Sequence, residues 1–311
     1  MTRVFFATDL HGSETCWRKF LNAARFHRAD VLICGGDLTG KAIIPVVESD
    51  GGYEFALSGT RQRVGADEVV EAVTQIQRRG YYPVRMSAGE VQELRADPGR
   101  VARLFTDQMC RTVERWLALA DEKLADSAVR CFVCPGNDDE MAIDDVIRAA
   151  RRVELAEGSV IDVDGFEMIS TGWSNPTPWN THREEPEAAL ADRVEAMARD
   201  LKDPAHAIFN LHVPPYGSGL DEAPALDEEL RPIHAGRAMR PVGSTAVRDA
   251  ILRHQPMLSL HGHIHEGRGV ARLGRTLALN PGSAYEEGLL MAAIVELDRR
   301  KGVMSYQLIS G

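Results

Sequence analysis

The 311-residue sequence lacks several features that would assign it to a specialised class of protein. No stretch approaches the roughly 18 consecutive apolar residues that a membrane-spanning helix needs. The opening run, MTRVFFATDL, has too short an apolar stretch for a secretory signal peptide, and an acidic residue follows that stretch too early. We therefore expect a cytoplasmic protein with no membrane partner. With 44% hydrophobic residues, the chain can bury a large core, as globular proteins do.

Cysteine is also scarce, and the 36 basic residues are outnumbered by 46 acidic ones. Five cysteines, an odd number spread over a long chain, argue against a disulfide framework and for reduced thiols. Cys131 and Cys134 form a single CxxC pair in an apolar run, which we interpret as buried strand thiols rather than a zinc or redox site. The net charge of −10 disfavours nucleic acid as a partner, although this count would not reveal bound divalent cations.

The first part of the chain has the pattern strand, loop, helix, strand. The apolar runs RVFFAT and DVLICGGD flank a stretch in which apolar residues recur at helical spacing. Such a βαβ unit places its two strands parallel. Asp9, His11 and Asp37 should then lie beyond the carboxyl ends of neighbouring strands, where open α/β sheets bind their ligands.

Residues 40–128 have the pattern of an elaboration inserted between core strands. A β-hairpin turning at residues 50–52 is predicted, then a helix over 67–79, a short strand YYPVRMS, and a long helix capped by Asp97 with Pro98 at its first position. We expect one domain over residues 1–311 with this insert at about 40–128. Its composition leaves open whether the insert covers a site, forms a homo-oligomer interface or extends a sheet.

Short strands dominate from residue 129 onward, interrupted by two predicted helices. The helices cover about 187–201 and about 245–254, the second capped by Ser244. Strands that need covering on both faces indicate an α/β protein in which two packed sheets are flanked by helices.

Five polar clusters stand at the ends of predicted strands, and together they indicate a metal site. They are Asp9-Leu10-His11, Gly35-Gly36-Asp37, Gly136-Asn137-Asp138, His212 and Gly262-His263-Ile264-His265. Carboxylate, amide and imidazole groups are ligands for first-row divalent metals, and two ions about 3.5–4 Å apart need a shared anion between them. The adjacent glycines fit loops in which the backbone approaches a ligand closely.

The order DxH, GGD, GN, H, GHxH resembles the calcineurin-like metallophosphoesterase superfamily. The motifs span residues 9–265, and the segments HGHIHEG and LNPGS also resemble family segments. The resemblance implies a four-layer α/β/β/α sandwich with two packed mixed β-sheets. It also implies a dinuclear centre with Asp9, His11 and His265 on one ion, Asn137, His212 and His263 on the other, and Asp37 bridging them.

The function implied is hydrolysis of a small phosphodiester or phosphomonoester by attack of a metal-bound hydroxide. Asp37, Asn137 and Asp138 are the expected catalytic residues, and Asn137, His212 and Arg268 the expected substrate contacts. Manganese or iron is expected by resemblance, while zinc, nickel or cobalt would also suit the ligands. The alternative is a catalytically weak or inactive protein that keeps this fold as a binding scaffold.

One position departs from the family pattern, because many members carry His directly after Gly-Asn and this chain carries Asp138. An aspartate beside cations favours its ionised form and cannot then donate a proton to the leaving group. Asp138 could instead orient a ligand histidine. His182 or His234 could supply the acid, although the sequence favours a solvated loop residue at both positions. The aromatic residues of the predicted loop at 173–179 are expected to pack within the protein rather than to stack on a nucleotide base.

Overall fold

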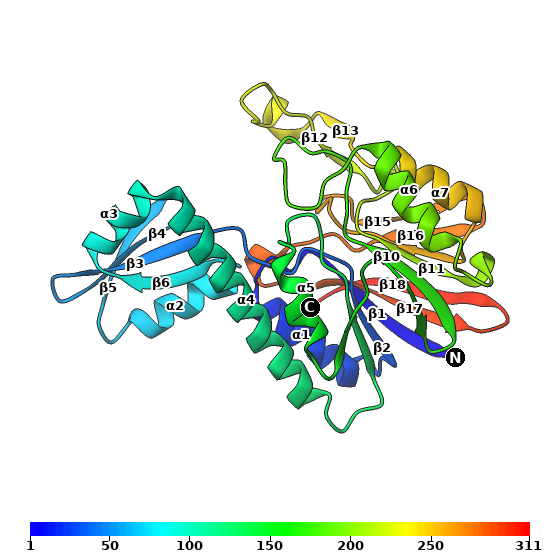
Figure 1. Ribbon diagram of the computed structural model, residues 1–311, viewed down its shortest axis with the longest axis horizontal. Helices are drawn as coiled ribbons and strands as arrows, with labels where there is room; N and C mark the ends of the chain where they lie inside the picture. Colours follow the sequence, from blue (N-terminus) through cyan, green and yellow to red (C-terminus); the bar gives the residue numbers. More distant parts are fainter.

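A computed structural model describes residues 1–311 and contains two six-stranded mixed sheets (Figure 1). In spatial order the first sheet consists of β18 (Gly302–Ser310), β17 (Met291–Asp298), β1 (Thr2–Ala7), β2 (Val31–Cys34), β7 (Arg130–Val133) and β8 (Val153–Leu155). The second consists of β15 (Gly269–Leu273), β16 (Thr276–Asn280), β14 (Leu258–Leu260), β11 (Ile208–Leu211), β10 (Phe166–Thr171) and β9 (Val160–Val163). Each sheet has parallel central strands; antiparallel pairing occurs at the β17–β18 side of the first sheet and at both edges of the second.

The two sheets pack face to face through an apolar layer. Val4 and Phe6 of β1 lie in one buried cluster with Met168 and Ile208 of the second sheet. The intervening Phe5 faces the opposite way and packs in the cluster that contains the first sheet's covering helices. This alternation follows from the two-residue period of a strand, which sends successive side chains to opposite faces.

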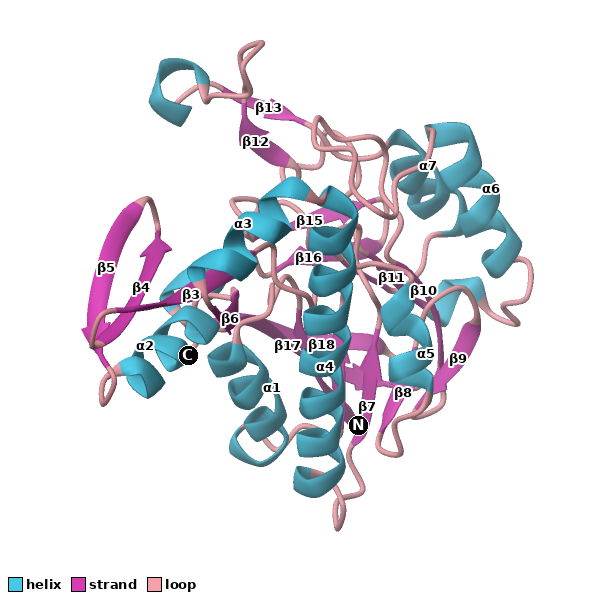
Figure 2. Cartoon of the chain, turned by 60° about the vertical axis from the view of Figure 1, so that its left-hand side comes forward, coloured by secondary structure: helices cyan, strands magenta, loops and turns pink.

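Helices cover the outer face of each sheet. The first sheet is covered by α1 (Glu14–Phe26), α4 (Pro98–Lys123) and α5 (Ala142–Arg148), and the second by α6 (Glu187–Ala198) and α7 (Thr245–His254) (Figures 1 and 2). The predicted caps are confirmed, since Asp97 accepts from the Arg100 N–H and Ser244 from the Val247 N–H. The layers are therefore α/β/β/α, as the resemblance implied.

The insert contains a four-stranded sheet of its own, which lies to the left of the main body in Figure 1. Its strands are β5 (Thr60–Gly65), β4 (Gly52–Leu57), β3 (Ile43–Ser49) and β6 (Tyr82–Met86), with helices α2 (Val69–Arg78) and α3 (Ala88–Ala96). The predicted hairpin is confirmed by the antiparallel pairing of β3 with β4. Six buried residues form a separate small core beneath this sheet.

Some elements were not predicted from the sequence. They are α3, α5, β5, β8 and the small hairpin of β12 (Glu222–Pro224) and β13 (Met239–Pro241), together with three 3₁₀ turns at 204–206, 233–236 and 285–287. The apolar residues of α4 are buried only from Met109 onward, and Val101, near its start, is 41% exposed. None of the helices combines the length and the apolar character needed to cross a membrane.

Both cysteines of the CxxC pair are buried, as predicted, with Cys131 in β7 and Cys134 directly after it. Burial raises the pKa of Cys131 to about 12 and the pKa of Cys134 well above its ordinary value. Thiols held in the protonated form are poor metal ligands and poor nucleophiles.

Candidate metal centre

The seven side chains of the ordered motifs follow the carboxyl ends of five parallel strands. Asp9 and His11 come after β1, Asp37 after β2 and Asn137 after β7, all in the first sheet. His212 comes after β11, and His263 and His265 come after β14, in the second sheet. Because the sheets pack face to face with these ends together, the loops from both sheets meet at one edge.

The backbone of these loops is strained at the motif residues. Asp9, His11, Asp37 and His263 adopt positive φ angles of 54°, 42°, 51° and 65°. The left-handed region is unfavourable for residues with a Cβ, so surrounding contacts must hold them there. Two such contacts are backbone hydrogen bonds, from Asp9 N to Gly36 O at 2.9 Å and from His11 N to Asp37 O at 2.9 Å.

Glycines allow the side chains of the cluster to lie against the backbone. A Cβ on Gly136 would stand 2.1 Å from Asp37 Oδ1, and one on Gly36 would stand 2.2 Å from His212 Nδ1. A Cβ on Gly262 would be 2.4 Å from Asp9 Oδ2. Glycine is required at these positions because the cluster side chains lie too close to the backbone for a Cβ, as expected from the sequence.

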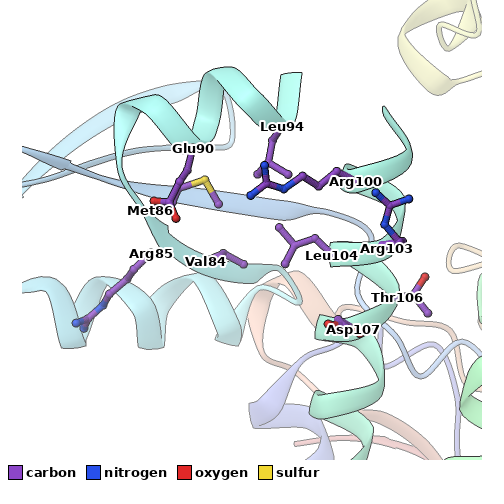
Figure 3. Close-up of a pocket in the computed structure, with 10 residues that line it drawn as sticks. All are labelled: Val84, Arg85, Met86, Glu90, Leu94, Arg100, Arg103, Leu104, Thr106 and Asp107. Atoms are coloured by element: carbon purple, nitrogen blue, oxygen red, sulfur yellow. The ribbon is translucent and has the colours of Figure 1, made fainter. Parts of the chain in front are cut away.

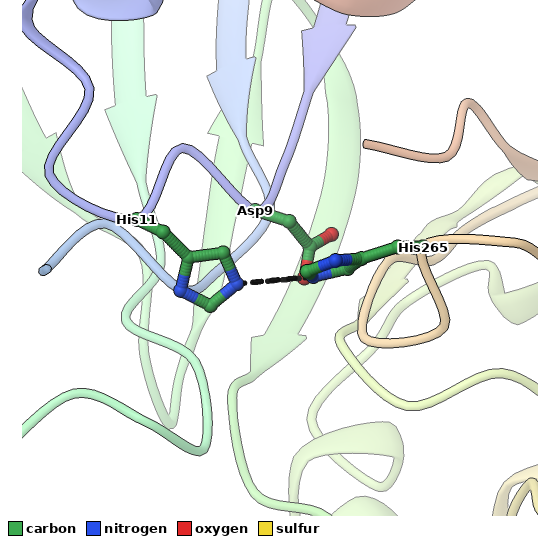
Figure 4. Close-up of side chains that lie close together, drawn as sticks. All are labelled: Asp9, His11 and His265. Carbon is green, nitrogen blue, oxygen red and sulfur yellow. Dashed lines mark hydrogen bonds and ion pairs between the residues drawn. The ribbon is translucent and has the colours of Figure 1, made fainter. Parts of the chain in front are cut away.

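Asp9, His11 and His265 form the first group of converging side chains (Figure 4). The Nε2 atoms of His11 and His265 face each other at 3.0 Å, and His265 Nε2 lies 3.5 Å from Asp9 Oδ1. Two imidazole nitrogens at this separation repel each other unless a proton or a cation lies between their lone pairs. The donor set of two imidazoles and a carboxylate suits a first-row divalent cation.

Asn137, His212 and His263 converge on a second point. Asn137 Oδ1 lies 3.1 Å from His212 Nε2 and 2.6 Å from His263 Nδ1. Asp37 lies between the two groups, since its Oδ2 is 3.4 Å from His212 Nε2 and 3.6 Å from His11 Nε2. A carboxylate in this position can be shared by two ions.

Burial sets the charge state of the cluster. Burial lowers the pKa of His11 to about 3 and that of His263 to about 4, which leaves neutral rings with free lone pairs. Burial alone would raise the pKa of Asp37, but the adjacent His212, whose own pKa is raised to about 9 despite its burial, holds it well below its ordinary value. Ionised carboxylates that are almost fully buried need compensating positive charge, which a protonated His212 supplies in part and bound cations would supply in full.

Supporting groups fix the orientation of the cluster. His212 Nδ1 is 3.1 Å from the Gly35 carbonyl, which directs Nε2 toward Asp37. The buried Asp139 accepts from the N–H groups of Leu38, Thr39 and Gly136, and so ties the loop after β2 to the loop after β7. In the segment LNPGS, Ser283 Oγ donates to the Asp9 carbonyl at 2.7 Å.

Asp138 lies at the border of the cluster. Its Oδ2 is 3.7 Å from His11 Nδ1 and 3.5 Å from Lys41 Nζ, and its Oδ1 accepts from Asn137 Nδ2 at 3.2 Å. Burial, with the nearby Asp37 carboxylate, raises the pKa of Asp138 to about 7 in the metal-free protein. The contact with His11 fits the predicted orienting role, which stays a prediction.

The other predicted residues lie outside this network of contacts. Arg268 Nη1 donates to the carbonyls of Pro281 and Ile309, at 3.1 and 3.2 Å, and makes no hydrogen bond to the cluster. His182 and His234 are exposed, as their solvated reading predicts. The loop at 173–179 contains both the half-buried Trp173, packed in the core of the second sheet, and Trp179, which is 64% exposed.

Sequence reasoning missed Lys41, Thr181 and Glu184. Lys41 places a cation beside Asp138, and Thr181 accepts from Asn137 Nδ2 at 2.8 Å. Thr181 in turn donates to Glu184 at 2.6 Å. These residues lie in loops without a motif, so only the folded structure brings them to the site.

A separate cavity of about 610 Å³ lies between β6, α3 and α4 of the insert (Figure 3). None of its lining residues belongs to the cluster. Of its three arginines, Arg100 and Arg103 pair with Glu93 and Asp97, and Arg85 lies over the Tyr53 ring. The charges of Arg100 and Arg103 are therefore compensated within the insert.

Comparisons with known proteins identify only distantly similar sequences and structures. No family model matches the chain. The chain is 27% identical over 165 residues to the uncharacterized protein MJ1162 of Methanocaldococcus jannaschii, a match that covers 51% of this chain and 68% of that protein.

Two solved structures from Thermus thermophilus extend the comparison. The structure of TT1561 is similar over 100% of this chain and 98% of its own, with a TM-score of 0.54 and 16% identity. A 5'-nucleotidase precursor is similar over 99% of this chain and 54% of its own, with a TM-score of 0.42 and 13% identity. At these identities the likeness concerns the fold alone. The chain thus shares its fold with TT1561, and the seven side chains of the ordered motifs converge, five of them buried and His263 and His265 partly exposed.

Proposed function

We propose that this protein is a dinuclear metal-dependent phosphoesterase that hydrolyses a small phosphodiester or phosphomonoester. The observation that supports the proposal is the convergence of seven side chains, from five strand ends, on two adjacent points with Asp37 between them. Burial of two carboxylates costs free energy, and folding alone does not require that cost. A pair of cations gives every one of these groups a ligand role.

The donor set fits two divalent ions. Asp9, His11 and His265 would hold one ion, and Asn137, His212 and His263 would hold the other, with Asp37 shared. When bound, such ions supply Lewis acidity and bring the pKa of a coordinated water toward about 7. Two divalent charges less two carboxylates leave a surplus of about two positive charges, which attracts an anionic phosphoester.

The chain's own residues would bind the substrate and manage its charge. Lys41 Nζ is the side-chain cation beside the cluster, and a phosphate oxygen that enters there can pair with it. Arg268 instead donates to backbone carbonyls, so Lys41 is the better candidate for this contact. With the ions bound, Asp138 would be ionised, so either another group protonates the leaving oxygen or the substrate has a leaving group that departs without protonation.

The alternative is a binding scaffold that has lost catalysis. Loss of function would be expected to damage the ligand set first, yet all seven side chains are present and converge. The one departure from the family pattern, Asp138, lies at the border of the cluster and not within the two ligand groups. This arrangement favours the enzyme.

Hydrolysis assays can separate the two functions. The purified protein should contain two metal ions per chain by elemental analysis and, with added manganese, should hydrolyse bis-p-nitrophenyl phosphate or p-nitrophenyl phosphate. Asp37→Ala should lower the rate more than about 100-fold, because both ions lose a ligand. The exposed Asp107 offers a matched control, and Asp107→Ala should leave the rate unchanged. Absence of hydrolysis with every metal would favour the scaffold.

A further inference from the structure

The loop at 174–185 folds around a single carboxylate. Glu184 accepts four hydrogen bonds, from the N–H and the hydroxyl of Thr177 at 2.8 and 2.6 Å, and from the N–H and the hydroxyl of Thr181 at 2.8 and 2.6 Å. Although partial burial opposes ionisation, these bonds hold the pKa of Glu184 below its ordinary value. The carboxylate is therefore ionised and can only accept.

The charge on Glu184 fixes the direction of the next hydrogen bond. A threonine hydroxyl has one hydrogen, and Thr181 gives its hydrogen to Glu184. Toward Asn137 the hydroxyl can then only accept, so the atom facing it at 2.8 Å must be the amide nitrogen. The second amide hydrogen points to Asp138 Oδ1 at 3.2 Å.

The orientation of Asn137 follows from these two bonds. With Nδ2 turned toward Thr181 and Asp138, Oδ1 faces His212 Nε2 and His263 Nδ1, at 3.1 and 2.6 Å. A flipped amide would bring its oxygen against a carboxylate and a hydroxyl that has no hydrogen to give. It would also present NH₂, which cannot bind a cation, to the second metal position.

The same loop also holds the backbone of Asn137. The Arg183 N–H donates to the Asn137 carbonyl at 3.1 Å, and the Ser174 N–H donates to the Arg183 carbonyl at 3.0 Å. The loop therefore restrains both the position of Asn137 and the rotation of its amide.

We propose that Thr181, itself held by Glu184, is a positioning residue that turns the carboxamide oxygen of Asn137 toward the second metal position. The inference rests on the proposed function, in which Asn137 is a metal ligand. Loss of the Thr181 hydroxyl removes the shorter of the two hydrogen bonds that hold the amide nitrogen, which weakens the second ion and spares the first. Groups that orient metal ligands typically change metal affinity by about 10–100-fold.

The test compares Thr181→Val, which has nearly the same shape but no hydroxyl, with Thr181→Ser, which keeps the hydroxyl. Thr177→Val is the matched control, because it removes an equivalent 2.6 Å bond to the same carboxylate oxygen without contact to Asn137. Each protein is titrated with Mn²⁺ and followed by electron paramagnetic resonance, which distinguishes a spin-coupled pair from a single ion. Circular dichroism checks that each variant is folded.

The expected result is a second Mn²⁺ bound about 10–100-fold more weakly in Thr181→Val, with wild-type affinity at the first position. Thr181→Ser and Thr177→Val should form the coupled pair as the wild type does. The proposal is overturned if Thr181→Val binds both ions normally, or if Thr177→Val is impaired to the same degree.

A readout without metal separates this inference from the proposed function. In the metal-free protein, the side-chain amide hydrogens of Asn137 should exchange slowly with water by nuclear magnetic resonance, and Thr181→Val should make them exchange faster. Unchanged exchange in Thr181→Val would contradict the positioning role. A wild-type protein that never binds a second ion would contradict the proposed function instead.

Discussion

At the scale of single residues, the site is built from conformations and contacts that the rest of the fold must hold in place. Four residues of the cluster adopt left-handed backbone conformations, each of which costs about 1–2 kcal/mol for a residue with a Cβ. Such strain persists only where surrounding hydrogen bonds determine the conformation, and it concentrates at functional sites. The strain thus supports a functional reading of these loops.

Lys41 allows a direct test of substrate charge recognition. Lys41→Met should raise KM for an anionic phosphoester by roughly threefold to tenfold and leave kcat nearly unchanged, because a partly exposed cation contributes a modest attraction. Steady-state kinetics at low ionic strength would measure this effect. Lys41→Arg keeps the charge and should keep KM, whereas an unaltered KM in Lys41→Met would remove Lys41 from the substrate contacts.

Sequence motifs located the seven converging side chains but not the residues that orient them. Asp9 and His265 could be found because glycines and strand ends mark their loops in a recognisable order. Thr181 and Lys41 could not, because a threonine or a lysine in a polar loop carries no signal until folding brings it to the site. Arg268 was predicted to contact substrate, yet its guanidinium donates to backbone carbonyls.

At the scale of elements, the loop after β7 is clamped by a buried arginine. Arg183, 1% exposed, pairs with Asp144 of α5 at 2.5 Å and donates to the carbonyls of Asp139 and Glu140 at 2.9 and 3.2 Å. Its removal would leave a carboxylate and two carbonyls without their partner.

Arg183→Met should lower the free energy of unfolding by about 3–5 kcal/mol, the usual effect of breaking a buried ion pair. Urea denaturation would measure the change. Arg18 provides a comparison, because its pair with Glu14 is exposed, so Arg18→Met should cost about 1 kcal/mol or less. Equal losses in the two variants would be inconsistent with the clamp.

The insert is joined to the site at Gly80. This residue has a φ of +81°, and a Cβ on it would stand 1.9 Å from the carbonyl oxygen of His11. Gly51, in the hairpin of the insert, has a φ of +72° and nothing within 4 Å, which makes it a matched control.

Gly51→Ala should cost about 1–2 kcal/mol from backbone strain alone. Gly80→Ala should cost more and should also weaken metal binding, because the clash displaces His11. Thermal unfolding and manganese titration would measure the two effects. Normal metal binding by Gly80→Ala would show that the insert does not influence the site.

The predictable elements are those with a strong hydrophobic period and a clear boundary. Strand β1 and the capped helix α4 could be predicted for this reason. Helix α3 has no buried residue, and β5 is mostly exposed, so neither shows the apolar pattern from which an element is predicted. The separate sheet of the insert also depends on pairing between distant residues, as in β3 with β6.

At the scale of the whole molecule, the metal site should stabilise the fold. Ions that bind only the folded chain add RT ln(1 + [L]/Kd), about 2.7 kcal/mol at a concentration 100 times Kd. Calorimetry should therefore show a lower Tm after chelation of the wild-type protein. Asp37→Ala should show a smaller response to chelator, and an equal response would place the stabilising ion elsewhere.

The central claim is that two ions occupy the cluster on either side of Asp37. Anomalous diffraction at the manganese edge, from crystals grown with Mn²⁺, tests it most directly. The account predicts two peaks about 3.5–4 Å apart, one beside Asp9, His11 and His265 and the other beside Asn137, His212 and His263. A fully folded chain with no anomalous peak at Asp37, or with its only ions elsewhere, would contradict the account.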